Sequence, residues 1–312
     1  MSVTLEHPPA LRCRDISTIA LTTSGSPVRV TGRVAGPEGA PAVLVLGGIS
    51  SDRRVSDTVT GQGWWRQQAG AGKPIDTNRY RILSFDFIGA DIPPFPSTQD
   101  QARAILALAD AAHIRDLAIV GSSYGGMIGL ALAALAPERV RELVVISAAD
   151  RSSEMAKAWR SIQRDTVELA IRLGDGKAGL DLARRLAMTT YRTPEEFEDR
   201  FAAPDANSRD ADGVTAYLGA RGKAWAETVD PQRFLALSRS MDAHRVDVSQ
   251  IRCPVTYLAA LEDRLVPADQ IAEAASHTPK GRLITLSSVY GHDAFLKEDA
   301  IIGATLDEIF GS

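Results

Sequence analysis

The chain has 312 residues, of which 45% are hydrophobic and 24% are charged, and this size suits one large α/β domain with an insertion, or two small domains. A formal net charge of -4 gives no electrostatic reason to expect nucleic acid or an anionic membrane as a partner. No stretch approaches the roughly 20 apolar residues that span a bilayer, and the N-terminus, MSVTLEHPPALRCRD, lacks a signal-peptide pattern. The only cysteines, Cys13 and Cys253, form neither a disulfide framework nor a metal cluster, so we expect a cytoplasmic protein.

Apolar runs recur along most of the chain. The first forty residues carry Gly and Pro between short alternating runs, which predicts an antiparallel start to a sheet. Helices are predicted over 99–111, where Ser97 and Thr98 suit a cap, over 124–136, and from about Ala294 to Phe310. Strands buried on both faces are predicted at 42–48, 80–89, 116–121, 141–148, 253–260 and 281–288. This alternation predicts an α/β fold whose mostly parallel sheet is covered by helices on both faces.

Residues 150–245 break the alternation. They form helices readily, they are rich in Arg, Glu and Asp, and they contain no convincing apolar strand. We interpret them as a helical insertion, or lid, between two strands of the main sheet. The predicted core is therefore 1–149 together with 246–312.

A G-x-S-x-G motif lies between a predicted strand and a predicted helix, as GSSYG at 121–125. In that context the central Ser123 occupies a sharp turn that exposes its hydroxyl as a nucleophile at a helix N-terminus. The backbone N–H of Tyr124 is then the natural first donor to an oxyanion. A second donor should come from the glycine-containing loop after strand 42–48, and either Gly48 or Ile49 can supply it.

A serine hydroxyl needs a base, and the base needs an orienting acid. Asp263 directly follows the strand at 253–260 and is the preferred acid, with Glu262 as the alternative. Of the five histidines, only His292 follows the last predicted strand. The order Ser123, Asp263, His292 is that of the α/β-hydrolase fold, which we predict here. No His or Cys spacing typical of a metal site occurs, so we expect no metal.

The chain resembles the homoserine O-acyltransferases, α/β-hydrolase-fold enzymes of methionine biosynthesis, over roughly residues 40–310. The loop LGGIS and the segment GWW at 63–65 look like the succinyltransferase branch, whereas many members carry Met at the position of Tyr124 and Gln at that of Ile128. The resemblance rests on GSSYGGM at 121–127, AMTTYRTPEEFEDRF at 187–201, FLALSRSMDAHRVD at 234–247 and YGHDAFL at 290–296.

The resemblance implies a ping-pong transfer of a succinyl group from succinyl-CoA to L-homoserine through acyl-Ser123, with acyl-CoA as a cosubstrate and no permanently bound cofactor. It also implies that Arg192 and Asp293 hold the amino-acid acceptor, and it leaves a homodimer open. Arg53 and Arg54 are candidates for meeting the succinyl carboxylate, because a buried charge needs a partner. Three alternatives remain at this point: acetyl-CoA as donor, serine as acceptor, or an esterase or thioesterase that uses the same three residues with water.

Overall fold

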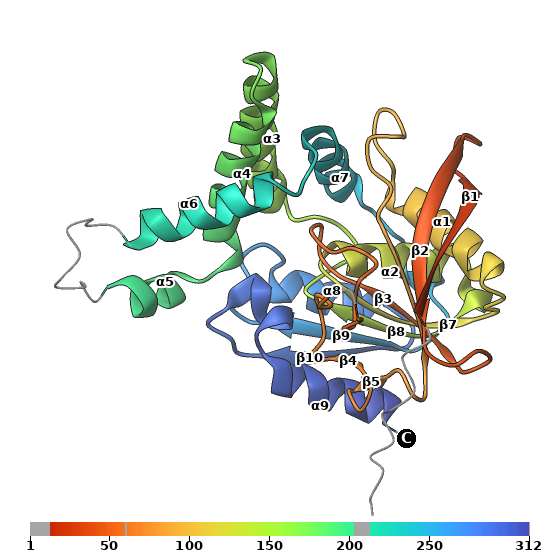
Figure 1. The fold of residues 1–312 in the computed structure, drawn as a ribbon. Helices are drawn as coiled ribbons and strands as arrows, with labels where there is room; N and C mark the ends of the chain where they lie inside the picture. Colours follow the sequence, from red (N-terminus) through yellow and green to blue (C-terminus); the bar gives the residue numbers. More distant parts are fainter. Residues whose placement is uncertain (1–12, 60, 203–212, 312) are drawn as a thin grey trace, which may run out of the picture.

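A computed structural model describes residues 13–59, 61–202 and 213–311. Its centre is an eight-stranded sheet in the order β1-β2-β6-β3-β7-β8-β9-β10 (Figure 1). The strands are β1 (Cys13–Leu21), β2 (Pro27–Ala35), β3 (Ala42–Leu46), β6 (Arg81–Phe85), β7 (Leu117–Ser122), β8 (Val140–Ile146), β9 (Val255–Ala260) and β10 (Gly281–Leu286). The predicted α/β fold is confirmed, and each of the six predicted buried strands has a counterpart in this sheet.

The sheet is antiparallel only at its N-terminal edge. β1 pairs antiparallel with β2, and β2 pairs antiparallel with β6. From β6 onward every neighbouring pair is parallel. The antiparallel start predicted from the first forty residues is therefore present, and the carboxyl ends of β3, β7, β8 and β9 lie at one edge of the sheet.

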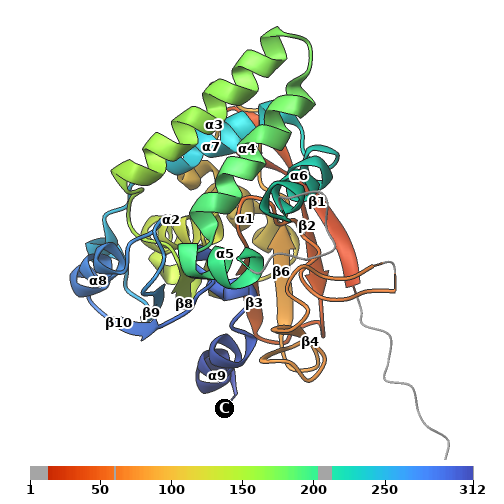
Figure 2. The ribbon, with the colours of Figure 1, turned by 90° about the vertical axis from the view of Figure 1, so that its left-hand side faces the viewer.

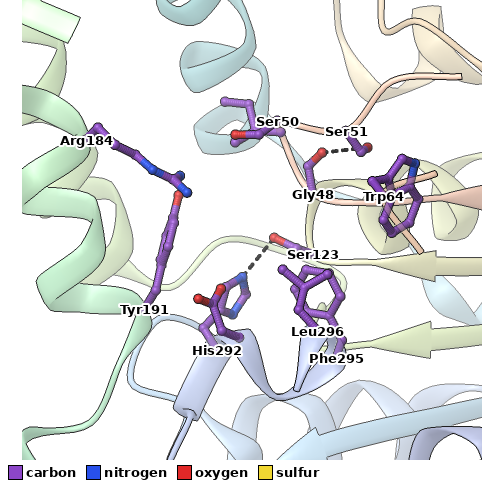
Figure 3. A pocket seen from close by; sticks show the side chains of 12 residues that line it. Gly48, Ser50, Ser51, Trp64, Ser123, Arg184, Tyr191, His292, Phe295 and Leu296 are labelled. Atoms are coloured by element: carbon purple, nitrogen blue, oxygen red, sulfur yellow. Dashed lines mark hydrogen bonds between the residues drawn. The ribbon is translucent and has the colours of Figure 1, made fainter. Parts of the chain in front are cut away.

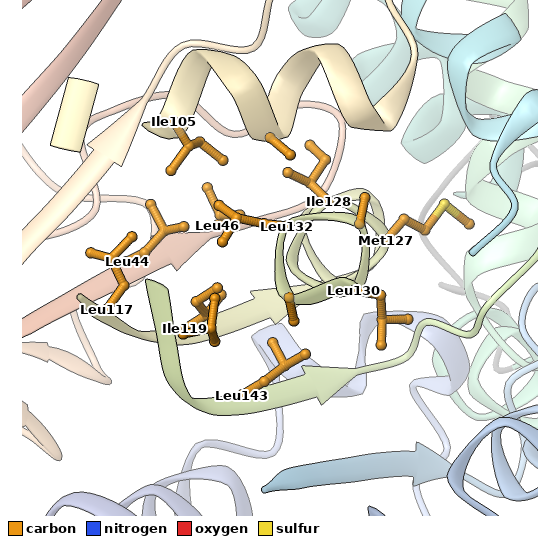
Figure 4. Close-up of a cluster of buried hydrophobic side chains, with 14 of the residues drawn as sticks. Leu44, Leu46, Ile105, Leu117, Ile119, Met127, Ile128, Leu130, Leu132 and Leu143 are labelled. Atoms are coloured by element: carbon orange, nitrogen blue, oxygen red, sulfur yellow. The ribbon is translucent and has the colours of Figure 1, made fainter. Parts of the chain in front are cut away.

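The parallel strands β6, β3, β7, β8 and β9 are largely buried on both faces, and their side chains alternate between two apolar layers. The prediction of a strand buried on both faces at 281–288 was wrong in its burial, because β10 lies at the edge of the sheet and is mostly exposed. Leu44 and Leu46 of β3 face the layer that packs on α1 (Thr98–Ala111) and α2 (Tyr124–Leu135) (Figure 4). Ser97 caps α1, as the sequence indicated. The long unbroken apolar runs in the sequence exist because helices cover both faces.

The opposite apolar layer brings early and late segments of the chain together. Val43 and Val45 of β3 face it, and so do residues of α9 (Asp299–Phe310). The indole N–H of Trp65 donates to the carbonyl oxygen of Phe295 over 3.0 Å. Early and late segments thus close over the same side of the sheet.

Five α-helices lie between β8 and β9 in the residues that the structure describes there, which exclude 203–212. They are α3 (Glu154–Arg172), α4 (Gly176–Tyr191), α5 (Pro194–Phe201), α6 (Gly213–Ala226) and α7 (Pro231–Ala243). Figures 1 and 2 show α3, α4, α6 and α7 beyond the edge of the sheet, with α3 antiparallel to α4. Val167, Leu180 and Phe234 belong to an apolar cluster of their own, and Ile49 of the core packs against it.

Three details differ from the sequence prediction. The final helix begins at Asp299, because residues Gly291–Leu296 form a separate 3₁₀ turn. The sequence reasoning did not identify α8 (Ala268–His277) or the two-residue strands β4 (Ala69–Gly70) and β5 (Ile75–Asp76). In the part of the chain that the structure describes, none of the helices combines the length and apolar character needed to cross a membrane.

Candidate active site

Ser123 lies in the sharp turn between β7 and α2. Its backbone has φ 52° and ψ -120°, a conformation that L-residues rarely adopt. A Cβ at Gly121 would lie 2.4 Å from the carbonyl oxygen of Gly125, and a Cβ at Gly125 would lie 2.5 Å from Cβ of Leu46. Both glycines of the motif are therefore required by the close approach of strand and helix.

Hydrogen bonds from the turn hold it to the two neighbouring strands. The Ser123 N–H donates to the carbonyl oxygen of Ile146 over 2.9 Å, and the Gly125 N–H donates to that of Gly47 over 2.9 Å. These bonds connect the turn to the ends of β8 and β3. The sheet thereby fixes the position of the Ser123 hydroxyl.

Ser123, His292 and Asp263 form one chain of hydrogen bonds. Nε2 of His292 lies 2.9 Å from Oγ of Ser123, and Nδ1 lies 2.8 Å from Oδ2 of Asp263. The other carboxylate oxygen of Asp263 accepts from the N–H groups of Leu265 and Val266, at 2.9 Å each. The carboxylate is thus held in place, and it can in turn orient the imidazole and stabilise its charged form.

The pKa of His292 lies above its ordinary value. Burial by itself lowers this pKa, but the charge of Asp263, its hydrogen bond and the charge of Asp293 together outweigh burial. The imidazole can therefore hold a proton taken from the hydroxyl. The alternative acid, Glu262, does not join this chain, because it accepts from the Ser288 N–H over 2.7 Å and from the Ser287 hydroxyl.

Backbone amides lie near the Ser123 hydroxyl. A Cβ built on Gly48 would be 4.0 Å from Oγ of Ser123, so this loop approaches the nucleophile closely. Among the residues that the structure describes, none accepts a hydrogen bond from the N–H of Tyr124, Gly48 or Ile49. All three predicted oxyanion donors are thus available, and Gly48 and Ile49 stay open as alternatives for the second. The phenol of Tyr124 itself is buried and bonds to Ser240 instead.

A pocket of about 200 Å³ opens beside Ser123 and His292 (Figure 3). Its walls come from the loop after β3, from α4 and from the 3₁₀ turn that carries His292. The lining residues are Gly48, Ile49, Ser50, Ser51, Trp64, Ser123, Arg184, Tyr191, His292, Asp293, Phe295 and Leu296. It therefore combines the candidate nucleophile and base with one cation and one carboxylate.

A second, smaller pocket of about 40 Å³ also reaches Ser123. It lies between the core and the inserted helices, and it shares Ile49, Ser123, Arg184 and Tyr191 with the first pocket. Its other lining residues are Met127, Arg160, Gln163, Ala183, Ala187, Thr190, Trp225, Phe234, Met241, Leu265 and Val266. Its walls are mainly apolar and include no carboxylate.

Arg192 and Asp293 are bonded to each other. Nε of Arg192 donates to Oδ2 of Asp293 over 2.8 Å, and a second guanidinium nitrogen lies 3.4 Å from Glu196. Asp293 lines the larger pocket, whereas Arg192 is 7% exposed and lines neither pocket. Asp293 does not cap the last helix, whose N-cap is Glu298.

Comparison with known proteins gives a consistent result. Residues 41–299 match the family model described as the alpha/beta hydrolase fold. A homoserine O-succinyltransferase of Xanthomonas campestris pv. campestris is 39% identical over 96% of this chain and 85% of its own length. The chain belongs to the homoserine O-acyltransferases of the α/β-hydrolase fold.

Other similar proteins differ in substrate. A serine O-succinyltransferase of Stenotrophomonas maltophilia is 32% identical over 82% of this chain and 83% of its own length. The crystal structure of a homoserine O-acetyltransferase from Staphylococcus aureus has a TM-score of 0.83 at 24% identity, covering 97% of this chain and 96% of that one. This last likeness concerns the fold alone.

Two arginines predicted at the acyl site of this acyltransferase lie elsewhere. Arg53 is paired with Asp86 and, over 3.0 Å, with Asp15, while Nε of Arg54 donates to Asp52 over 2.8 Å. Neither Arg53 nor Arg54 lines either of the two pockets that contain Ser123. The expectation that they meet the acyl carboxylate is not met, because carboxylates outside the pocket already take both charges.

The sequence reasoning did not single out Arg184 and Tyr191, which line both pockets. The ring of Tyr191 lies 5.6 Å from that of His292, and burial raises the pKa of its phenol, which stays neutral beside the base. Both residues are on α4, and a spacing of seven places them on one helix face. The seven-residue spacing of Arg184 and Tyr191 within the predicted insertion was the one sequence signal that could have indicated that they share a helix face.

Proposed function

We propose that this acyltransferase moves a succinyl group from succinyl-CoA to the side-chain hydroxyl of L-homoserine through acyl-Ser123. The observation that carries the proposal is the hydrogen-bonded chain from Ser123 through His292 to Asp263, at a pocket that also holds Asp293. The identity of 39% to a homoserine O-succinyltransferase supports both the donor and the acceptor. No permanently bound cofactor is needed, because acyl-CoA enters as a cosubstrate.

The first half-reaction acylates the serine. His292 Nε2 takes the hydroxyl proton as Ser123 Oγ attacks the thioester carbonyl, and the carbonyl oxygen becomes an oxyanion. The N–H of Tyr124, together with that of Gly48 or Ile49, donates to this oxyanion. The C–S bond then breaks, and His292 returns the proton to the departing thiolate of coenzyme A.

The second half-reaction repeats this chemistry with a different nucleophile. His292 takes the proton of the homoserine hydroxyl while that oxygen attacks the acyl-serine ester. The bond to Ser123 breaks, and His292 protonates the serine oxygen. The free enzyme is thereby restored, and Asp263 stabilises the imidazolium in each half.

The acceptor amino acid would be held beside the base. Asp293 faces the pocket and can accept hydrogen bonds from an ammonium group, while Arg192 holds that carboxylate in place. Arg192→Met should therefore raise the KM for homoserine. CoA release in a single turnover should change little. Equal loss in both half-reactions would show that Arg192 does not act on the acceptor.

We further propose that residues 150–245 act as a lid on a core formed by 1–149 and 246–312. Arg184 and Tyr191 of α4 line both pockets, and Trp225 of α6 lines the smaller one. The indole N–H of Trp225 donates to the hydroxyl of Ser50 over 3.0 Å, in the loop that follows β3. The inserted helices thus complete the pocket and contact the loop that carries the oxyanion amides.

One product analysis tests the proposal. Purified protein receives equimolar succinyl-CoA and acetyl-CoA with equimolar homoserine and serine, and mass spectrometry identifies the ester that accumulates. O-Succinylhomoserine is expected, and Ser123→Ala should neither form it nor gain an acyl mass. A dominant acetyl or serine ester would correct the donor or the acceptor. CoA release at the same rate without any amino acid would instead indicate a hydrolase.

A further inference from the structure

The N–H of Tyr124 lies between two backbone N–H groups that are hydrogen-bonded. Those of Ser123 and Gly125 donate to carbonyl oxygens at the ends of β8 and β3, over 2.9 Å each. The N–H of Tyr124 donates to none of the residues that the structure describes. An oxyanion donor is most effective when it is preorganised, because no reorientation is then needed as charge develops. The contacts that hold this peptide in position therefore bear on the rate of the reaction.

The side chain of Tyr124 is a third attachment of the nucleophile turn. It is fully buried, and its ring packs edge-on against that of Phe87, with the ring centroids 5.0 Å apart. Its phenol oxygen lies 2.8 Å from the hydroxyl oxygen of Ser240 on α7, and it accepts from the side-chain amide of Gln101 on α1 over 3.3 Å. Burial raises the pKa of this phenol to about 12, so it stays protonated and can donate to Ser240.

Both partners of the phenol are themselves held in place. Gln101 is fully buried, and its amide group exchanges two hydrogen bonds with the backbone of Ile88, accepting over 2.9 Å and donating over 2.8 Å. Ser240 is fully buried on α7, and the next residue, Met241, lines the smaller pocket at Ser123. The phenol thus links the residue that carries the oxyanion amide to α1 of the core and to the inserted helix α7.

Packing alone does not require the hydroxyl of Tyr124. A phenylalanine would fill the same space and contact Phe87 in the same way, without a buried polar atom that needs a partner. Neither Tyr124 nor Ser240 lines either pocket, so neither side chain touches a substrate. Any effect of their hydrogen bond on the reaction must then pass through the backbone of the nucleophile turn.

We propose that the hydrogen bond between the hydroxyl groups of Tyr124 and Ser240 positions the N–H of Tyr124 for the oxyanion, so that the inserted helix α7 contributes to the rate of acyl transfer. The two side chains act as positioning groups. The proposal rests on the acyl-serine mechanism given above. Because an oxyanion forms at the thioester and again at the acyl-serine ester, loss of this bond should slow both half-reactions by a similar factor.

Tyr124→Phe removes the hydroxyl alone. It should lower the maximal rate of each half-reaction by about 10- to 100-fold, less than the roughly 10²–10³-fold loss when an oxyanion donor is removed outright, and should change the KM for succinyl-CoA and homoserine by less than about threefold. Butylboronic acid adds to a serine hydroxyl as a tetrahedral boronate, one oxygen of which takes the place of the oxyanion. Its affinity should fall by a factor similar to that of the rates, whereas the affinity for free CoA should not change.

Ser240→Ala removes the other half of the bond and should show the same pattern. Since the two hydroxyl groups form a single bond, the double variant Tyr124→Phe/Ser240→Ala should be about as slow as the slower single variant. Losses that multiply in the double variant would show that the two groups act independently.

Tyr257→Phe is the matched control. Tyr257 is also fully buried, its hydroxyl oxygen lies 2.8 Å from that of Thr278, and it lines neither pocket. The variant should lose thermal stability to an extent comparable with Tyr124→Phe. It should keep the wild-type rates of both half-reactions and the wild-type affinity for the boronate.

Three results would overturn the assignment. They are rates and boronate affinity in Tyr124→Phe that match those of Tyr257→Phe, a loss confined to one half-reaction, and multiplying losses in the double variant. Failure of the acyltransferase mechanism looks different, because the wild-type protein would then form no acyl-Ser123 from succinyl-CoA or acetyl-CoA.

Discussion

The backbone at Ser123 is strained, and the strain should be measurable as a difference between two inactive variants. At φ 52° and ψ -120° a side chain costs about 1–3 kcal/mol relative to glycine. The larger conformational entropy of glycine in the unfolded chain offsets about 0.5–1 kcal/mol of the stability that Ser123→Gly gains by relieving this strain. Ser123→Gly also lacks the Cβ methyl of Ser123→Ala and so loses part of the roughly 0.8 kcal/mol that burial of a methyl group contributes. Ser123→Gly should therefore be more stable than Ser123→Ala by about 1 kcal/mol.

Calorimetry on the two variants measures this difference. Neither variant can bond to His292, so the comparison isolates the Cβ atom. With about 2.1 cal/mol/K of unfolding entropy per residue, 1 kcal/mol over 312 residues corresponds to a Tm difference of about 1.5 °C. If Ser123→Ala melts at the same temperature as Ser123→Gly or higher, the turn is not strained, and the argument from backbone conformation fails.

Three further predictions concern Asp263, His244 and Gly125. Asp263→Asn should lower kcat by roughly 10⁴-fold and, because it removes the charge that raises the pKa of His292, should move the acid limb of the kcat/KM profile to lower pH. Burial lowers the pKa of His244 from 6.5 to about 4, so only the unfolded chain binds this proton between those values. The free energy of unfolding should fall by about 3 kcal/mol as pH drops through that window, and His244→Gln should flatten this slope in urea titrations. Gly125→Ala should lower the free energy of unfolding by about 1–3 kcal/mol, because the new Cβ would lie 2.5 Å from the Cβ of Leu46. The same contact should displace the turn and slow acyl-enzyme formation. Acylation at the normal rate would contradict this packing argument.

Local patterns were sufficient to predict most of the fold. The runs that became β3, β6, β7, β8 and β9 are mostly apolar, since helices cover both faces of the sheet. The final helix was predicted too early, because GHDAFL is compatible with a helix but forms a 3₁₀ turn that aims His292 at Ser123. Chain order and position after strands were also enough to select the three side chains that the structure joins by hydrogen bonds.

Charge pairing could not be predicted from the sequence. Adjacent arginines in a loop look available, yet Arg53 reaches Asp15 and Asp86, which lie on or next to other strands. The guanidinium of Arg192 is suited to a substrate carboxylate, but in the structure it donates to Asp293, which is 101 residues away in the sequence. Nothing in the sequence selected Arg184 as a site residue. The structure shows that its guanidinium lies against the rings of Tyr191 and Trp225 and at the pocket. A cation is available to a ligand only if no acid from a distant segment reaches it.

The bond from Trp65 to Phe295 has a consequence for the order of folding. It joins residues 230 positions apart, and Phe295 belongs to the 3₁₀ turn that carries His292. During synthesis the nucleophile turn emerges long before its base, so a nascent chain can assemble β3, β7 and β8 while it remains chemically inert. Closing so long a loop is slow compared with local helix formation. Recovery of acyl-enzyme formation during refolding should therefore lag behind recovery of helical circular dichroism.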